Sequence, residues 1–257
     1  MIKLEAISRT FHVGDDDVHA LRDICFEVAN GEYLSVMGPS GSGKSTLLNA
    51  LGLLDRPDAG QYWLAGTETV ALPENERAQL RRANIGFVFQ AYHLIPRLTA
   101  RENIELPMML AGVHPDLRAD ASHRVMTRLG LLDRAHHLPN QLSGGQRQRV
   151  AIGRSIIMQP ELLLADEPTG NLDSRSGEEV TELLEELNAG GLTLIVVTHD
   201  AQLGARARRQ IRMLDGAIDT DTVVVPESVR SIADSPPRDS INPRTDSASS
   251  NHERGVE

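Results

Sequence analysis

The chain has 257 residues, 40% of them hydrophobic, which is enough to form one large core or two small ones. Acidic residues outnumber basic ones by 36 to 26, which gives a net charge of −10, and aromatic residues make up only 3%. This composition argues against a basic or base-stacking nucleic-acid groove, so we expect no nucleic-acid partner.

Export, membrane and disulfide signals are missing from the sequence. The N-terminus has no apolar signal core, and no run of 18 or more apolar residues occurs, so we expect a chain that is neither exported nor membrane-crossing. Cys25 is the only cysteine, which rules out an intramolecular disulfide and fits a reducing cytosol. We expect Cys25 to be a small buried apolar residue.

The first part of the chain predicts antiparallel strands. Residues 2–11 and 23–29 alternate apolar and polar side chains, and a turn containing a glycine and acidic residues lies between them. We expect these strands to flank the main sheet.

Three short apolar runs, residues 33–37, 162–165 and 193–198, predict a central parallel sheet, because strands covered on both faces are continuously apolar. Residues 46–161 are far more than the ~30 residues of a simple strand-helix-strand unit. Residues 91–160 are therefore predicted to be an inserted, mostly helical subdomain.

The domain boundaries follow from composition. We expect an α/β domain over residues 1–225, and a disordered tail over residues 226–257, which are rich in Ser, Pro, Asp and Arg. Within the domain, the charge-rich segments 76–82 and 123–137 are expected to be solvated helix faces.

Residues 38–45, GPSGSGKS, match the phosphate-loop (P-loop) pattern G-x-x-x-x-G-K-[ST], with an apolar strand before them and a helix-like segment after. Glycines let backbone N–H groups turn toward phosphate oxygens, and the helix start adds its positive dipole end. Lys44, one of only two lysines among the 26 basic residues, is predicted to bind the outer phosphates. Ser45 would offer its hydroxyl to Mg²⁺.

An acidic pair follows the apolar run at residues 162–165. Carboxylates at that position lie at the carboxyl edge of a parallel sheet, the edge that also carries the phosphate loop. Asp166 is predicted to hold Mg²⁺ through water, and Glu167 to orient and deprotonate the water that attacks the γ-phosphorus. Taken alone, such a pair is more often a helix cap.

A second glycine turn, residues 143–146, precedes a second helix-like segment and could also present N–H groups to an anion. The chain thus has two phosphate-binding helix starts about 100 residues apart. That is unusual for one nucleotide bound by one chain.

In this order the motifs resemble those of the ATP-binding-cassette (ABC) ATPases. They are GPSGSGKST at 38–46, LSGGQ at 142–146, LLLADEPTGNLD at 162–173 and VVTHD at 196–200. Residues 85–108 are similar to the branch that contains the lipoprotein-releasing, macrolide-exporting and cell-division ATPases. The resemblance covers about residues 1–221.

The resemblance implies a P-loop NTPase core with a mixed, mainly parallel sheet, an antiparallel β subdomain and an inserted helical subdomain. It also implies a homodimer in which two chains pack head to tail. Each ATP would lie between the P-loop of one chain and Ser143, Gly144, Gly145 and Gln146 of the other.

Further roles are implied by the same resemblance. Gln90 would reach Mg²⁺ and the attacking water, His199 would contact the γ-phosphate, and Asp173 would couple the two sites across the dimer. Taken alone, a glutamine is usually a surface or capping residue, and a histidine after a strand is usually a satisfied loop residue.

Phe11 occupies the position of the family's adenine-stacking aromatic residue, although it could instead pack in the core. The residues expected to bind ATP in the same chain are Phe11, Gly38, Pro39, Ser40, Gly41, Ser42, Gly43, Lys44, Ser45 and Thr46, with Mg²⁺ held by Ser45, Gln90 and Asp166.

The helix after LSGGQ has Gly153 and Ser155 where the family often has alanine. An interior glycine costs roughly 1 kcal/mol relative to alanine. Either this helix is less rigid, or a neighbour approaches it closely.

Residues 91–110 are more apolar than an ordinary surface loop. They either pack within the helical insert or form the docking surface for a transmembrane permease subunit. The second interpretation describes an ATP-hydrolysing subunit that drives a separate membrane protein in export, lipoprotein extraction or mechanical signalling, and that lies on the cytoplasmic face of the inner membrane.

Two other functions remain as alternatives. One is a soluble ABC ATPase that regulates or assembles other molecules without transport. The other is a small-molecule kinase built on the same P-loop, which would leave LSGGQ and His199 unexplained.

Overall fold

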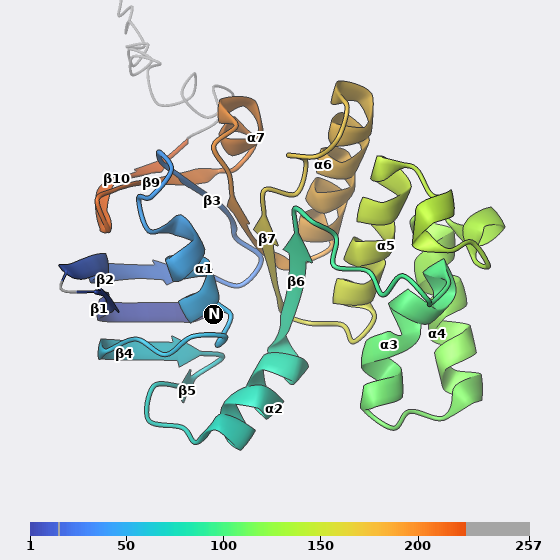
Figure 1. The fold of residues 1–257 in the computed structure, drawn as a ribbon, viewed down its shortest axis with the longest axis horizontal. Helices are drawn as coiled ribbons and strands as arrows, with labels where there is room; N and C mark the ends of the chain where they lie inside the picture. The colour runs from blue at the N-terminus through green and yellow to red at the C-terminus, as the bar shows by residue number, and fades with distance from the viewer. Residues whose placement is uncertain (15, 225–257) are drawn as a thin grey trace, which may run out of the picture. The chain divides into compact units, whose positions relative to one another are not determined.

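The computed structural model describes residues 1–14 and 16–224. The tail predicted for residues 226–257 lies outside the described residues. Figure 1 shows two sheets of unequal size and a group of helices.

An antiparallel sheet, in the order β2-β1-β4-β5, comes from the first part of the chain. Its strands are β1 (Ile2–Val13), β2 (Asp16–Val28), β4 (Ala59–Leu64) and β5 (Thr67–Glu68). The predicted position of this sheet beside the main one is confirmed. The predicted start of the second strand at residue 23 is wrong, because the pairing of β1 with β2 continues out to Val13 and Asp16.

The larger sheet has the order β10-β9-β3-β8-β7-β6. Five neighbouring strands are parallel, and β10 is antiparallel at one edge. The strands are β3 (Tyr33–Met37), β6 (Ile85–Phe89), β7 (Leu162–Asp166), β8 (Thr193–Val197), β9 (Arg209–Leu214) and β10 (Ala217–Val223).

The central strands are covered on both faces, as predicted. Along β7, Leu162 and Leu164 belong to one core cluster, and Leu163 and Ala165 belong to a second. The first cluster surrounds α1 (Lys44–Leu51), which packs between the two sheets, and the second lies under the helices of the other face. The two-residue period of a strand therefore explains why β7 must be apolar throughout.

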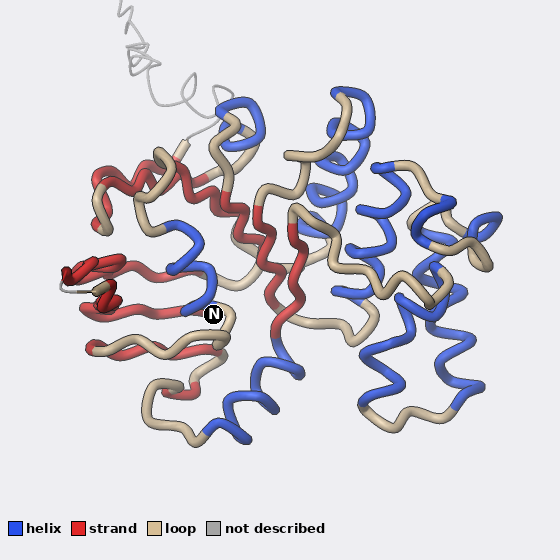
Figure 2. Tube along the Cα trace, viewed as in Figure 1, coloured by secondary structure: helices blue, strands red, loops and turns tan. Residues whose placement is uncertain are grey.

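Most of the chain between β6 and β7 is helical, and further helices precede β6 and follow β7 and β8 (Figure 2). The α-helices are α2 (Glu74–Asn84), α3 (Ala100–Leu110), α4 (Pro115–Arg128), α5 (Gly144–Ile156), α6 (Ser174–Ala189) and α7 (Ala201–Ala205), and the 3₁₀ helices are η1 (Leu132–Arg134) and η2 (Pro139–Gln141). The predicted fold class, including the inserted helices, is confirmed. None of the helices in the described part of the chain has the length and apolarity that crossing a bilayer requires.

Gly153 of α5 is explained by close packing. An ideal Cβ at this position would lie 2.8 Å from Leu129 Cδ1 and 3.0 Å from Ile104 Cδ1. All three residues are buried within the helical insert. Of the two interpretations of this glycine, the close approach of neighbouring side chains is the one that the structure supports.

Two predicted burial states are wrong. Cys25 is exposed, because its neighbours Ile24 and Phe26 face the core and alternate residues of a strand face opposite sides. Arg77, in a segment predicted to be solvated, is only 4% exposed. Its guanidinium donates to the carbonyl oxygen of Asp55 at 2.8 Å and to Glu74 Oε2 at 2.9 Å, so it satisfies backbone and carboxylate acceptors beside α2.

Candidate nucleotide-binding site

A cavity of about 1090 Å³ lies where β3, β6, β7 and β8 end. This carboxyl edge is where parallel α/β sheets bind ligands. The sequence-predicted residues that line the cavity are Phe11, Ser40, Gly41, Gly43, Lys44, Ser45, Thr46, Gln90, Asp166, Glu167 and His199.

The P-loop joins β3 to α1 in a conformation that requires glycine. Gly43 has φ +97°, and an ideal Cβ there would lie 2.3 Å from the backbone oxygen of Ala20. Gly38 is similarly confined, with an ideal Cβ 2.3 Å from the backbone oxygen of Met213. A side chain at either position would move the loop away from its present path.

The polar groups of the loop fit a phosphate ligand. Lys44 Nζ donates to the backbone oxygens of Gly38 and Pro39, both at 2.8 Å, so its ammonium lies over the loop. Ser42 Oγ is buried and has no hydrogen-bond partner among the described residues. The start of α1 directs its N–H groups toward the same space. Together these groups match the needs of an anion rather than those of a buried structural turn.

The acidic pair lies at the end of β7. Burial raises the pKa of Asp166, the charge of Glu167 raises it further, and Lys44 lowers it. Gln90 directly follows β6, in which Phe89 pairs with Asp166, so the Gln90 and Asp166 positions adjoin at the sheet edge. With the hydroxyl of Ser45 these residues provide only oxygen ligands, the set that Mg²⁺ prefers, so the donor chemistry fits this ion.

Glu167 is held firmly in an unusual backbone conformation, with φ +44°. Its backbone N–H donates to the carbonyl oxygen of Val197 at 2.9 Å. The hydroxyl of Thr198 donates to Oε2 at 3.0 Å, and the backbone N–H of His199 donates to Oε1 at 2.9 Å. The loop after β8 therefore offsets the strain and fixes the carboxylate at the cavity.

His199 lies against the same carboxylate. Its Nδ1 is 2.6 Å from Glu167 Oε1, while the side chain of His199 is 73% exposed and that of Glu167 only 16%. The imidazole thus contacts the glutamate with one edge and remains accessible on the other.

Phe11 lines the cavity and is 37% exposed as a residue, so the alternative of a core position is wrong. The guanidinium carbon of Arg9 lies 4.7 Å from the centre of this ring. A cation over an aromatic face at this distance is attractive and orients the ring.

The second glycine turn does not line the cavity. Ser143 caps α5, accepting from the backbone N–H of Gln146 at 3.3 Å, and Gln146 Oε1 accepts from the N–H of Ser143 at 3.0 Å. None of residues 143–146, all of them described, belongs to the lining. Within one copy, the two predicted anion sites are therefore separate.

Asp173 also lies outside the lining and caps α6. Its Oδ1 accepts from the backbone N–H of Ser176 at 3.0 Å, and this hydrogen bond lowers the pKa of Asp173. The carboxylate is exposed, so a cap is the structural role that one copy of the chain provides for it.

Sequence reasoning missed the rim of the cavity. Asp17, His19 and Arg22 of β2 line it, as does Asp215 from the turn between β9 and β10. The backbone N–H of Arg22 donates to the carbonyl oxygen of Gly216 at 2.8 Å, which joins these two segments. No local sequence signal marks these residues, because tertiary packing of the two sheets brings them to the P-loop.

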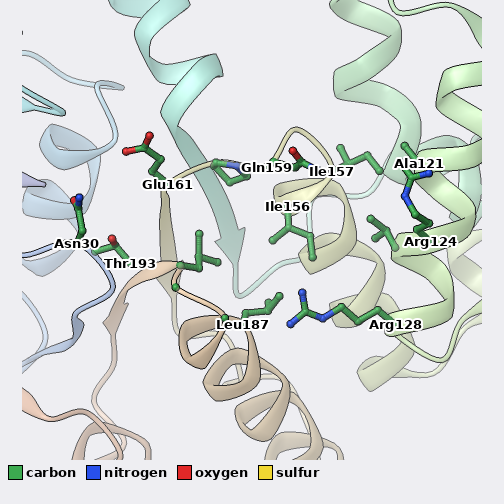
Figure 3. Close-up of a pocket in the computed structure, with 15 residues that line it drawn as sticks. Asn30, Ala121, Arg124, Arg128, Ile156, Ile157, Gln159, Glu161, Leu187 and Thr193 are labelled. Atoms are coloured by element: carbon green, nitrogen blue, oxygen red, sulfur yellow. The ribbon is translucent and has the colours of Figure 1, made fainter.

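A second cavity, of about 640 Å³, lies at the opposite edge of the large sheet (Figure 3). Glu161 and Thr193, at the starts of β7 and β8, form one side, and Arg124 and Arg128 of α4 form the other. Ile156 and Ile157 lie between them. It contains none of the predicted site residues, which all lie among the described residues, and so it is distinct from the P-loop cavity.

An apolar strand, a glycine loop that opens a helix and an acidic pair at the end of a neighbouring parallel strand define a P-loop nucleotide-binding protein. The family model described as "ABC transporter" matches residues 21–170, so the chain belongs to the ABC transporter family.

The chain resembles curated export proteins over most of its length. It is 48% identical over 237 residues to the macrolide export ATP-binding/permease protein MacB of Rhodopseudomonas palustris strain HaA2, covering 92% of this chain and 36% of that protein. It is 50% identical over 223 residues to MacB of Bartonella henselae, covering 87% and 34%. The chain thus spans about a third of the length of these relatives.

Solved structures of similar fold are ABC cassettes. The ATP-binding cassette MJ0796, in a dimeric post-hydrolysis state bound to ADP and Pi, has a TM-score of 0.81 and 40% identity, covering 88% of this chain and 99% of that one. A second dimeric structure of MJ0796, described as a bacterial ABC transporter cassette, has the same TM-score and 41% identity, with the same coverage. These findings confirm the predicted ABC ATPase class.

Proposed function

We propose that the chain binds ATP together with Mg²⁺ between two copies of itself and hydrolyses it to drive a transmembrane partner. The observation that carries this proposal is the separation, in one chain, of the two helix starts that are predicted to bind phosphate. The P-loop lines a large cavity, and residues 143–146 do not. A head-to-tail second copy would bring its residues 143–146 to the open side of that cavity, and the dimeric state of the similar MJ0796 cassette supports this arrangement.

The P-loop, residues 38–46, would surround the phosphates with backbone N–H groups. Lys44 would exchange its two loop carbonyls for phosphate oxygens, which its flexible stem permits. Ser45, Gln90 and Asp166 would hold Mg²⁺, and the ion would neutralise the charge of the β- and γ-phosphate oxygens.

Glu167 would act as the base that orients and deprotonates the attacking water. Support comes from its carboxylate, which faces the cavity at a fixed position between Thr198 and His199. His199 would use its exposed edge to contact the γ-phosphate. Phe11, oriented by Arg9, would stack on the adenine base.

In the partner copy, the hydroxyl of Ser143 and the N–H groups of Gly144, Gly145 and Gln146 would face the γ-phosphate at the start of α5. Asp173, which lies at the start of α6, would couple the two sites across the dimer. Its exposure in one copy leaves it accessible for that contact.

The transmembrane permease would dock near residues 91–110. Ile95, Met109 and Leu110 are 43%, 44% and 75% exposed, so this segment offers apolar side chains that a partner could cover. The relatives named ATP-binding/permease proteins support a membrane partner. The chain would then lie on the cytoplasmic face of the inner membrane. Residues 1–225 would form the ATP-binding domain, with 91–160 as the helical subdomain that meets the permease.

The alternative function, a soluble ABC ATPase that regulates or assembles other molecules, predicts that no membrane protein is recovered. Co-purification from detergent-solubilised membranes of the source cells distinguishes the two. Recovery of a multispanning membrane protein, lost when Leu110 is changed to Glu, supports the permease. Recovery of none from membranes that contain the chain overturns it.

The nucleotide part of the proposal has its own test. Light scattering of the purified Glu167→Gln variant should show the dimer mass with ATP and Mg²⁺ and the monomer mass with ADP. A monomer under both conditions would contradict an ATP-dependent dimer.

A further inference from the structure

Asn171 contacts Gln90, although 81 residues separate them in sequence. Its Nδ2 donates to the backbone carbonyl oxygen of Gln90 at 2.9 Å, and its Oδ1 accepts from Gln90 Nε2 at 3.4 Å. The two residues follow β6 and β7, so the contact joins the ends of neighbouring strands.

The donor and acceptor pattern of this pair fixes both amides. A backbone carbonyl can only accept, so Asn171 must present its NH₂ group to the carbonyl of Gln90. Its Oδ1 is then the atom that remains for the Gln90 side chain. The Gln90 side chain must therefore donate to Asn171 Oδ1 through its own NH₂ group, which turns its Oε1 away from Asn171. Without such a partner, the two ends of a glutamine amide exchange by a simple rotation.

Gly170 provides an independent constraint on the same side chain. An ideal Cβ at this residue would lie 2.8 Å from Gln90 Nε2 and 3.2 Å from its Cδ. The Gln90 amide therefore rests directly on the backbone beside Asn171. The hydroxyl of Tyr92 also approaches the carbonyl oxygen of Asn171, at 3.4 Å, which ties this segment to the residues after Gln90.

We propose that Asn171 is a positioning residue that fixes the amide orientation of Gln90, so that the oxygen and not the nitrogen faces the bound Mg²⁺. This inference rests on the proposed function, in which Gln90 is one of the oxygen ligands. A misoriented amide presents two N–H donors to a cation, which repel it. Asn171 thus acts on metal affinity through Gln90 without touching the metal or the nucleotide.

The test compares Mg²⁺ dependence in matched variants of the full chain. Equilibrium binding of a fluorescent ATP analogue is titrated with Mg²⁺, and affinity for the analogue is also measured in EDTA. Asn171→Ala should raise the half-saturating Mg²⁺ concentration about fivefold, the scale of one neutral hydrogen bond. Affinity without metal should stay within about twofold of wild type, because Asn171 contributes nothing to phosphate or base contacts.

Asn188→Ala is the matched control. Like Asn171→Ala, it removes a side-chain amide that donates to the backbone, in this case to the carbonyl oxygens of Gly31 at 3.0 Å and Leu192 at 2.8 Å, but at the other end of α6. It should leave the Mg²⁺ dependence unchanged whatever its effect on stability.

A second arm uses Gln90→Glu, whose two carboxylate oxygens make orientation irrelevant. In that background Asn171→Ala should cause no further rise in the half-saturating Mg²⁺ concentration. A further fivefold rise there, or reduced turnover with wild-type Mg²⁺ dependence in Asn171→Ala alone, would overturn the positioning role only. If ATP binding and turnover by the wild-type protein do not depend on Mg²⁺, the proposed function is overturned, and this inference with it.

Discussion

Replacing Glu167 by Gln should abolish hydrolysis while leaving the fold and ATP binding intact. The two side chains have the same shape, so Oε1 can still accept from the backbone N–H of His199, and the new NH₂ group can donate to Thr198 Oγ1. Because the hydrogen bonds that hold the side chain can be remade, we expect the free energy of unfolding to change by no more than ~1 kcal/mol.

The kinetic effect should be much larger. A glutamine cannot accept the proton of the attacking water, and loss of a general base lowers the rate about 10² to 10⁴-fold. That range corresponds to roughly 3 to 5 kcal/mol in the activation barrier. Single-turnover release of phosphate, measured beside thermal denaturation and ATP binding, separates chemistry from folding. Turnover within tenfold of wild type in a folded variant would refute the role of Glu167 as the base.

The other predictions concern the P-loop and its neighbours. Lys44→Arg should impair ATP turnover in a folded protein, because the planar guanidinium cannot follow the phosphates as a flexible ammonium can; unchanged turnover would show that the lysine is incidental. Gly43→Ala should prevent ATP binding, since the added Cβ would meet the Ala20 carbonyl at 2.3 Å; isothermal titration that finds normal affinity would contradict this. Burial raises the pKa of Asp166 above its ordinary 3.8. The folded state is therefore stabilised by protonation of Asp166 at pH values below 3.8, and this stabilisation is lost as the pH rises through the raised pKa. Asp166→Asn should therefore raise the Tm of the nucleotide-free protein at pH 7 and lose this advantage near pH 3.8, and an equal or lower Tm at pH 7 would contradict the reasoning.

The sequence was sufficient for the features that depend on local pattern. The continuous apolar run of β7 predicted a strand buried on both faces, and the GPSGSGKS pattern predicted a glycine loop that opens α1. The pairing of the two was enough to predict that Asp166, Glu167 and Lys44 share one sheet edge, as they do.

What the sequence did not reveal depends on tertiary contacts. Arg77 lies in a charged stretch, yet it is buried, because its guanidinium donates hydrogen bonds to a carbonyl and a carboxylate acceptor beside α2. His19 and Asp215 reach the cavity through the packing of two sheets that are far apart in the chain. Asn171 has no local signal for its partner, because the end of β6 is brought to it only when β6 pairs with β7.

The central claim is that each ATP site uses two copies of the chain, and a mixing experiment tests it most directly. Two variants are made in the Glu167→Gln background. Lys44→Ala damages the P-loop, and Ser143→Glu places a carboxylate at the start of α5. Neither variant alone should retain ATP. A differently tagged mixture forms heterodimers with one site built from the intact P-loop of one copy and the intact residues 143–146 of the other. We expect doubly purified heterodimers to retain one ATP each. Heterodimers that retain none, or a Ser143→Glu variant that retains ATP as a monomer, would contradict a site shared between two copies.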